Sequence, residues 1–197
     1  MKSASKENKL KLMNTAQALS ETPDSIEMTA PEQSDFFIDE MNGIEKNDAP
    51  FFYEKRKGDF VLSAKVQPQF TKYFDAGGLF IYDSPKKWIK LEFERTDLGY
   101  PSIVSVITNG MSDDCNGERM DNVEAVYLQI IRKSDYWMLH YSLNGKNWKF
   151  VRYFKLKMKS EVKIGLEAQA PIGKSCKVLF SKIKISENDV VDMKKGK

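Results

Sequence analysis

The clearest structural signal in the chain is Trp88-Ile89-Lys90-Leu91-Glu92-Phe93-Glu94. Ile89, Leu91 and Phe93 are separated by polar or amphipathic residues, so in an extended chain they all point to the same side. Such alternation is typical of an antiparallel strand with one face on the core and the other toward solvent. The stretch therefore predicts a half-buried β-strand.

The same period of two recurs along most of the chain. Residues 59–66 and 162–169 alternate as strictly and predict two further strands. Shorter candidates are residues 25–30, 35–39, 51–55, 78–82, 102–109, 124–132, 136–142, 148–155 and 176–185. Turn signals separate them, and Asn144-Gly145 is the clearest, because both positions of a tight hairpin turn need a positive φ. About twelve short strands without a long helix predict an all-β fold, two antiparallel sheets packed as a jelly-roll sandwich.

The two ends of the chain depart from this pattern. Residues 1–24 predict an N-terminal extension that is partly helical or flexible, because the apolar residues between Leu10 and Leu19 have helical spacing before a proline-containing break. The sandwich is predicted over residues 25–186, followed by a polar tail over residues 187–197. Met1 to Lys11 lacks the apolar segment of a secretory signal, so we expect a cytoplasmic protein.

Composition narrows the class of function. The chain has 197 residues, with 31 Lys or Arg and 28 Asp or Glu, so its formal net charge is only +3. A nucleic-acid-binding domain usually carries a stronger basic patch, and no apolar run approaches the roughly 20 residues of a membrane helix. Cys115 and Cys176 lack the spacing of metal ligands. We therefore expect two reduced thiols, no metal and no cofactor, and neither nucleic acid nor a membrane as a partner.

Short motifs in a defined order resemble a known family. Ser34-Asp35-Phe36-Phe37 resembles its Thr-Asp-Phe-Trp, residues 74–79 resemble its Tyr-Asp-Gln-Ala-Gly-Leu, and Trp88-Ile89-Lys90 with Glu94 resembles its Trp-Ile-Lys…Glu. Further motifs follow in the same order: Ser105–Gly110, Ser112-Asp113, Arg132, Tyr141–Gly145 with Trp148, Arg152 and Gly165–Pro171. The chain thus resembles the concanavalin A-like jelly-roll domains of unknown function described as enolase-regulation-protein-like. It is more distantly similar to the sandwich domain appended to β-xylosidases.

The resemblance implies a fold more than an activity. It extends from about Ser25 to Ile185 and implies a sandwich of the concanavalin A-like lectin/glucanase type. Phe37 and Asp114 stand where the family usually has tryptophan, and Ala76 stands where it has glutamine. The type or affinity of a ligand can therefore differ from that of relatives.

The polar side of residues 88–94 predicts a ligand-binding face. Same-face residues of a strand lie about 6.6–7 Å apart, which aligns an aromatic ring, a cation and two anions. A sugar ring stacks on an aromatic side chain, and charged groups form strong hydrogen bonds with its hydroxyls. The predicted ligand-binding residues are Trp88, Lys90, Glu92, Glu94, Ser105, Asn109 and Arg132. Ser105 and Asn109 are expected on the same face as Lys90. An ordinary solvent face, with Arg132 paired to Glu94 across the sheet, is the alternative.

Three functions follow from these features. The first is a non-catalytic binding module for a carbohydrate or small polar ligand on the concave sheet. The second, which the resemblance implies, is a protein-interaction or regulatory module that acts on a metabolic enzyme. The third is a glycoside hydrolase that uses Glu92, Glu94 and Asp97. Lys90 should favour the charged form of both neighbouring glutamates, which opposes the role of a general acid, so we favour a non-catalytic role.

Two further groups receive a structural interpretation. His140 is the one histidine of the chain, and it has no partner at metal-ligand spacing. Asp113, Asp114 and Asn116 offer oxygen atoms that suit calcium, but a stretch rich in Asp and Asn is more often only a turn.

Overall fold

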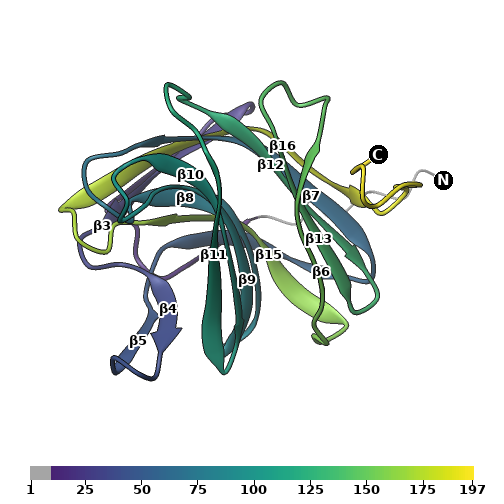
Figure 1. Ribbon diagram of the computed structural model, residues 1–197, viewed down its shortest axis with the longest axis horizontal. Helices are drawn as coiled ribbons and strands as arrows, with labels where there is room; N and C mark the ends of the chain where they lie inside the picture. The colour runs from purple at the N-terminus through teal and green to yellow at the C-terminus, as the bar shows by residue number, and fades with distance from the viewer. Residues whose placement is uncertain (1–9) are drawn as a thin grey trace.

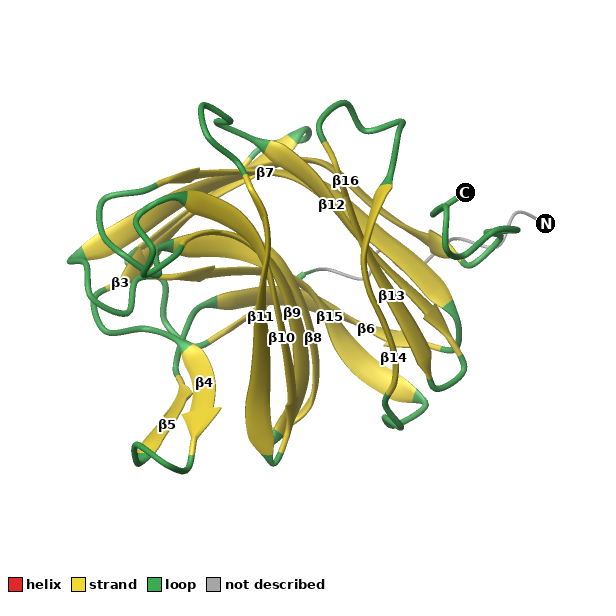
Figure 2. Cartoon of the chain, viewed as in Figure 1, coloured by secondary structure: helices red, strands yellow, loops and turns green. Residues whose placement is uncertain are grey.

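The computed structural model describes residues 10–197, and the regular secondary structure in this range is entirely β-strand (Figure 2). The strands are β1 (Lys11–Met13), β2 (Ala18–Glu21), β3 (Ser25–Pro31), β4 (Phe36–Asp39), β5 (Ile44–Asn47), β6 (Phe51–Lys57), β7 (Phe60–Gln69), β8 (Ala76–Ser84), β9 (Lys87–Arg95), β10 (Pro101–Asn109), β11 (Met111–Arg119), β12 (Val126–Lys133), β13 (Tyr136–Ser142), β14 (Lys149–Lys155), β15 (Glu161–Gln169) and β16 (Ser175–Glu187). The described part of the chain has no helix with the length and hydropathy needed to cross a membrane.

Two seven-stranded antiparallel sheets stack face to face (Figure 1). Sheet A has the strand order β1-β6-β15-β8-β9-β10-β11, and sheet B has the order β14-β13-β12-β7-β16-β3-β2. The remaining strands, β4 and β5, form a hairpin that projects from the sandwich at the lower left of Figure 1. This arrangement confirms the predicted two-sheet antiparallel sandwich.

The main hydrophobic core lies between the two sheets. Ile89, Leu91 and Phe93 of β9 are fully buried in it, as their alternation predicts. The alternate side chains of residues 60–66 in β7 enter the same core from sheet B. Each such side chain contributes about 1.5–3 kcal/mol when it is removed from water, so this interior holds the two layers together.

A second, smaller core covers the outer face of sheet A. Its buried members are Phe36, Ile38, Ala49, Phe51, Phe80 and Trp88. The ring centroid of Phe36 in β4 lies 4.5 Å from that of Phe80 and 5.5 Å from that of Trp88. Trp88 is therefore fully buried. The prediction that Trp88 lies on an open face is wrong, because the β4–β5 hairpin packs on this part of the strand.

Hydrogen bonds fix the hairpin at its base and on its side. The Oδ1 atom of Asp48 accepts the backbone N–H of Asp35 at 3.0 Å. The carbonyl of Asp35 accepts the N–H groups of Asp48 and Ala49 at 2.9 and 3.2 Å. On the side, the N–H of Ile38 donates to Oγ of Ser112 in β11 at 3.0 Å. The hairpin is thus held to sheet A by polar bonds as well as by its apolar core.

The N-terminal segment is extended, so the predicted helix over residues 10–19 is wrong. β1 pairs with β6 at the edge of sheet A, and β2 pairs with β3 at the edge of sheet B. Asn14 lies between them with a φ of 62°, a left-handed conformation that asparagine tolerates. Its Nδ2 atom donates to the carbonyls of Asn47 and Ala49 at 3.0 and 2.8 Å. The sandwich therefore begins before residue 25, and the rest of the predicted extension, residues 1–9, lies outside the described residues.

The segment after β16 folds back over the outer face of sheet B. Nε2 of Gln129 donates to the carbonyl of Gly196 at 3.2 Å, and Nε2 of His140 lies 3.1 Å from the carbonyl of Lys194. His140 is fully buried beneath this segment. The predicted polar tail over residues 187–197 thus covers part of the sandwich.

The connection between β13 and β14 is longer than the Asn144-Gly145 signal predicts. β13 ends at Ser142 and β14 begins at Lys149, so the hairpin is present but the two-residue turn is wrong. Gly145 has a φ of 70°. The Asn144 side chain instead accepts the N–H groups of residues 146 and 147, both at 2.9 Å, which stabilises a wider loop.

The two cysteines differ in accessibility, which predicts a two-stage thiol reaction. Cys115 is exposed and Cys176 is buried, and both are free. Burial also raises the pKa of the Cys176 thiol, so its reactive thiolate is disfavoured. We expect an aromatic disulfide reagent to titrate one thiol in the native protein and both in guanidinium chloride without a reductant. Cys115→Ser should abolish the native signal, whereas two thiols that appear only after reduction would contradict the free-thiol assignment.

Candidate functional site

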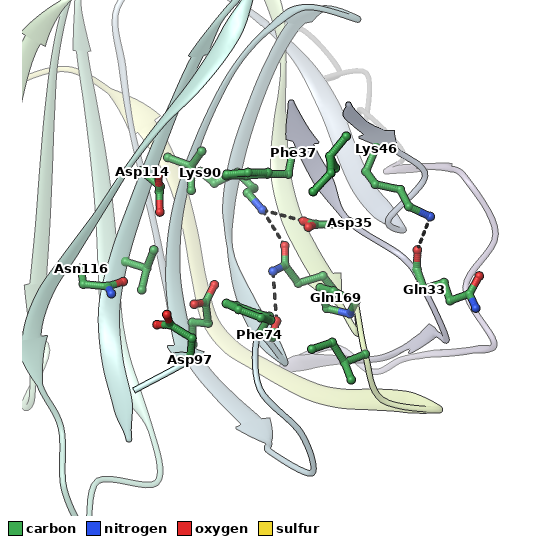
Figure 3. A pocket seen from close by; sticks show the side chains of 16 residues that line it. Gln33, Asp35, Phe37, Lys46, Phe74, Lys90, Asp97, Asp114, Asn116 and Gln169 are labelled. Carbon is green, nitrogen blue, oxygen red and sulfur yellow. Dashed lines mark hydrogen bonds and ion pairs between the residues drawn. The ribbon is translucent and has the colours of Figure 1, made fainter. Parts of the chain in front are cut away.

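A pocket of about 470 Å³ opens on the outer face of sheet A beside the β4–β5 hairpin (Figure 3). Its lining residues are Gln33, Asp35, Phe37, Ile44, Lys46, Phe74, Lys90, Glu94, Asp97, Val104, Val106, Asp114, Asn116, Gln169, Pro171 and Ile172. One wall is formed by the hairpin and by its stem, the residues 33–35 that lead into β4. The opposite wall is formed by β9, β10 and β11. The pocket thus depends on segments that are far apart in the sequence.

Small residues of β8 make room for polar side chains under the pocket. The strand register places Gly78 between Glu167 of β15 and Glu92 of β9. A Cβ atom at Gly78 would lie 2.4 Å from the carbonyl oxygen of Leu91 and 2.8 Å from Cγ of Glu92. Glycine at this position therefore leaves the space in which the two glutamate side chains meet. Two residues earlier in β8, Ala76 is paired in the same way with Gln169 of β15 and Glu94 of β9.

Lys90 is the centre of the polar network at the pocket floor. Its side chain is 2% exposed. Nζ donates to Oε1 of Gln169 at 2.6 Å and to Oδ1 of Asp35 at 3.1 Å (Figure 3). It also lies 3.3 Å from Oε2 of Glu92, so one ammonium group joins the hairpin stem, β9 and β15. Gln169 extends the network, because its Nε2 donates to the carbonyl of Phe74 at 3.0 Å.

The charge balance around Lys90 favours one protonated glutamate below it. Burial lowers the pKa of Lys90, but the surrounding carboxylates outweigh this and raise it above its usual 10.5. Burial and then the charge of Glu92 raise the pKa of Glu167 well above 4.5. Burial raises the pKa of Glu92 too, although the Lys90 charge opposes it. Oε2 of Glu92 has its ion pair with Lys90, whereas the oxygens of Glu167 have no hydrogen-bond partner among the described residues, so Glu167 is the glutamate whose protonation relieves the repulsion between the two.

Glu94 lies in the wall of the pocket with an unusual protonation preference. Its residue is 7% exposed. Burial, followed by the charges of Glu92, Asp35 and Asp114, raises its pKa well above 4.5, and Lys90 only partly opposes this. Lys90 favours the charged form of Glu94, as predicted, but burial and the neighbouring carboxylates outweigh it. A protonated carboxyl group at this position can donate a hydrogen bond into the pocket.

Two phenylalanines supply apolar surface on either side of the pocket, and one of them is held by a strained backbone. Phe37 extends from the hairpin, and Phe74 lies in the loop before β8. Phe74 has a φ of 65°, a left-handed conformation that is costly for an aromatic residue. Its N–H donates to the carbonyl of Arg95 at 2.6 Å. Oδ2 of Asp75, next in the chain, accepts two backbone N–H groups from residues 71 and 72 at 2.7 and 2.8 Å.

The structure separates the predicted site residues into three groups. Lys90 and Glu94 line the pocket, and Glu92 lies directly beneath it. Trp88 is on the same strand face but is covered by the hairpin and does not line the pocket. The remaining three lie elsewhere.

Ser105 and Asn109 face away from the pocket. Ser105 pairs with Leu91 across the sheet, and Val106 pairs with Lys90. Directly paired residues of neighbouring strands share a face, so Ser105 points into the sandwich and the prediction that it shares a face with Lys90 is wrong. Asn109 has the same parity as Ser105 and lies at the end of β10.

Arg132 belongs to sheet B and is not part of this site. Its Nη2 donates to the carbonyl of Lys159 at 2.8 Å, and its Nε donates to the carbonyl of Ser134 at 3.1 Å. The alternative prediction, a pair between Arg132 and Glu94 within one sheet, is also wrong, because Glu94 lies in sheet A. The positive charge next to Glu94 is that of Lys90.

The sequence did not predict that the polar residues of the pocket wall lie together. Gln33, Lys46 and Gln169 were not singled out at all. Asp35 was noted only within a family motif, Asp97 only as a candidate for hydrolysis, and Asp114 and Asn116 only as candidate calcium ligands. Asp114 and Asn116 lie in β11 rather than in a turn, and Asp113 pairs with Arg152 of β14 at 2.7 Å. Among the described residues no group of His, Cys, Asp and Glu side chains has the arrangement of a metal site. Asn42-Gly43 was the available signal for the hairpin, since Asn-Gly favours a turn between two strands.

Fold and site together define a β-sandwich domain with a ligand-sized pocket on the outer face of one sheet. The chain belongs to the family described as "Protein of unknown function (DUF1349)", whose model matches residues 12–188. It is 22% identical over 169 residues to "Regulation of enolase protein 1" of Saccharomyces cerevisiae, which covers 86% of this chain and 85% of the yeast protein. The expected resemblance to the enolase-regulation-protein-like family is therefore confirmed.

Solved structures show the same fold. A functionally unknown protein from Saccharomyces cerevisiae superposes with a TM-score of 0.86 at 21% identity, covering 91% of this chain and 96% of that one. A xylan β-1,4-xylosidase from Bacillus halodurans C-125 gives 0.65 at 13% identity, covering 93% of this chain but 40% of the enzyme. The carbohydrate-binding module CBM66 from Bacillus subtilis gives 0.58 at 11% identity, covering 89% and 95%. At these identities the structural likeness shows the fold alone.

Removing the buried ammonium group should strongly destabilise the protein. In Lys90→Met, Asp35 and the two glutamates beneath the pocket lose their cation, and breaking a buried ion pair costs about 3–5 kcal/mol. Urea denaturation followed by tryptophan fluorescence measures this. Lys46→Met is the control, because Lys46 pairs with Asp48 at 3.7 Å with both side chains exposed, and such pairs contribute at most about 1 kcal/mol. Equal unfolding midpoints for Lys90→Met and the parent would contradict the role assigned to Lys90.

The raised pKa of Glu167 predicts a pH-dependent stability difference. Because the folded protein prefers the protonated group, its contribution to the free energy of unfolding is complete below about pH 4.5 and is lost as the pH rises through the raised pKa. Other carboxylates, such as Glu118 with its lowered pKa, act in the opposite direction. The test therefore compares the free energy of unfolding of Glu167→Gln with that of the parent at each pH.

As the pH rises from 4.5 toward neutrality, we expect the free energy of unfolding of Glu167→Gln to increase relative to that of the parent. Urea denaturation at several pH values measures it. Glu124→Gln, an equivalent change at an exposed loop position, is the control for the loss of a carboxyl group outside this network. A difference that moves against Glu167→Gln with rising pH would show that Glu167 is ionised in the folded protein.

Proposed function

We propose that the chain is a non-catalytic binding module whose outer-face pocket on sheet A takes a carbohydrate or another small polar ligand. The observation that carries this proposal is the pocket itself. Its volume of about 470 Å³ lies within the roughly 300–1,000 Å³ of small-molecule sites. Apolar rings and a few convergent polar groups line it, which is the composition that such sites usually have.

The lining matches the chemistry of a sugar ring. Phe37 and Phe74 offer aromatic faces for the apolar C–H surface of the ring. Asp97 and Asp114 accept hydrogen bonds from hydroxyl groups, and Asn116 both accepts and donates. Carboxylates form the stronger, charge-assisted hydrogen bonds, so Asp97 and Asp114 would set the orientation of the sugar in the pocket.

Relatives with printed functions support this choice. The Bacillus subtilis structure that shares the fold is a carbohydrate-binding module, and the match covers 95% of it. The sandwich shared with the xylosidase is part of a larger enzyme. One stand-alone domain of this fold is thus named for binding a carbohydrate, which supports a ligand over a reaction here.

The polar floor favours binding over hydrolysis. Glycoside hydrolysis needs one protonated and one ionised carboxyl group on either side of the scissile bond. Glu94 has the character of the acid, but Glu92 is buried beneath the pocket and paired with Lys90. We therefore propose no turnover. Release of nitrophenol from aryl β-xylosides that is lost in Glu94→Gln would contradict a purely binding role.

A protein-interaction or regulatory role is the second candidate. It rests on the 22% identity to a yeast protein named for the regulation of enolase, which suggests a metabolic enzyme as partner. Affinity capture at native abundance, with the parent protein and a Phe37→Ala variant, tests it. Recovery of no stable partner would count against this candidate. We also propose a cytoplasmic location, which fractionation of the source cells tests.

Removing the hairpin ring should weaken carbohydrate binding. Phe37→Ala deletes one apolar wall of the pocket, and an aromatic contact of this kind is worth about 0.5–1.5 kcal/mol beyond its buried area. We expect an affinity loss of about tenfold for the saccharide selected by a glycan array, measured by calorimetry. Phe150→Ala is the control, because Phe150 is 49% exposed on β14 of sheet B. Equal losses in both variants, or none in Phe37→Ala, would remove the pocket as the binding site.

A further inference from the structure

The pocket wall carries acidic side chains that no cation of the described chain neutralises. Lys90 and Lys46 are the cations that line the pocket. Lys90 is engaged by Asp35, Glu92 and Gln169, and Nζ of Lys46 donates to the carbonyl of residue 33 at 3.0 Å. Asp97 and Asp114 lie in the opposite wall and form no ion pair within residues 10–197.

Glu94 is the second, independent sign of an absent partner. Its residue is more than nine-tenths buried, at 7% exposed, and it lines the pocket. Its side chain makes no hydrogen bond and no ion pair with any other described residue. The carboxyl group of Glu94 therefore depends on whatever occupies the pocket for its hydrogen bonds.

The surroundings of these groups make the pocket attractive to a positive charge. Asp35, Glu92 and Glu167 lie below the wall formed by Glu94, and Lys90 is the one buried cation among them. Phe37 and Phe74 add aromatic rings, whose faces attract ammonium groups. A phosphorylated or carboxylated ligand would instead meet like charges.

We propose that the ligand of this pocket carries a protonated amine, and that the saccharide class it selects is an amino sugar. The ammonium group would bind at Glu94, Asp97 and Asp114, while the sugar ring contacts Phe37 and Phe74. This inference rests on the proposed carbohydrate-binding function and specifies its substrate class.

Binding of the ammonium group is coupled to the proton on Glu94. The groups that face Glu94 are Glu92 and Lys90 on β9, Asp35 on the hairpin stem and Asp114 on β11, with Asp97 in the same wall. Burial and the charges of Glu92, Asp35 and Asp114 raise the pKa of Glu94 well above 4.5, and the charge of Lys90 partly opposes them. An ammonium ion displaces this proton, so the affinity for an amino sugar rises with pH until the amine itself loses its charge. The affinity for a neutral sugar lacks this dependence.

The experiment is a chemical-shift titration of the ¹⁵N-labelled protein with four probes. They are D-glucosamine, N-acetyl-D-glucosamine, D-glucose and putrescine, which separate the amine from the ring. A charge-assisted bond to a buried carboxylate is worth at least a tenfold change in affinity. We therefore expect glucosamine to bind about tenfold more tightly than the two neutral sugars, and putrescine to bind more weakly than glucosamine.

Glu94→Gln should lower the ratio of the glucosamine affinity to the glucose affinity toward one and remove its rise with pH. Glu124→Gln, at an exposed loop position outside the pocket, should keep the parent ratio. These results together would support the inference. The ratio of the two affinities is compared because a substitution that weakens the binding of all sugars equally leaves the ratio unchanged.

The contradicting outcomes are distinct for the two proposals. If neutral sugars bind as tightly as glucosamine, with shifts at Phe37 and Phe74, the amine inference falls and the carbohydrate-binding function stands. If no sugar binds at any pH, both fall. Putrescine binding as tightly as glucosamine overturns the amino-sugar assignment, because the ring would then contribute nothing.

Discussion

The site depends on one buried ammonium group. Lys90 lies at the junction of the hairpin stem, β9 and β15, 3.1 Å from Asp35 and 2.6 Å from Gln169. Charges are costly to bury unless they are paired, so this cation and the carboxylates around it stabilise one another and none is easily replaced alone. The hairpin that forms one wall of the pocket is tied to the sheet through the same contact. A single charge thus links the covering of sheet A to the chemistry of its pocket.

The two faces of sheet A have different uses. Its inner face closes the main core with Ile89, Leu91 and Phe93, as any sandwich sheet does. Its outer face is divided between an apolar part under the hairpin, with Phe36 over Trp88, and a polar part that opens as the pocket. The division explains how a strand that alternates perfectly can be buried on both sides, and why the polar residues of its second side are held in fixed positions.

Alternation predicted the sandwich because side-chain direction in a strand depends only on local geometry. It also predicted that Lys90 and Glu94 point away from the core, and both line the pocket. The alternation of residues 88–94 carried no information about what covers that face, so Trp88 was assigned to a ligand surface. Parity across strands depends on register, which a hairpin loop sets, and this is why Ser105 was placed on the wrong face. The shared pocket was not predicted because Asp35, Asp97 and Asp114, which the sequence offered only separately, come together through tertiary structure, although Asn42-Gly43 indicated the hairpin.

The most direct test is a crystal structure of the protein grown with a saturating amount of the saccharide that binds best in solution. We expect the sugar between Phe37 and Phe74, with polar contacts to Glu94, Asp97 or Asp114, and with Lys90 still buried against Asp35. A sugar bound to sheet B or on the hairpin exterior, with the pocket on sheet A empty, would contradict the assignment of this pocket as the functional site.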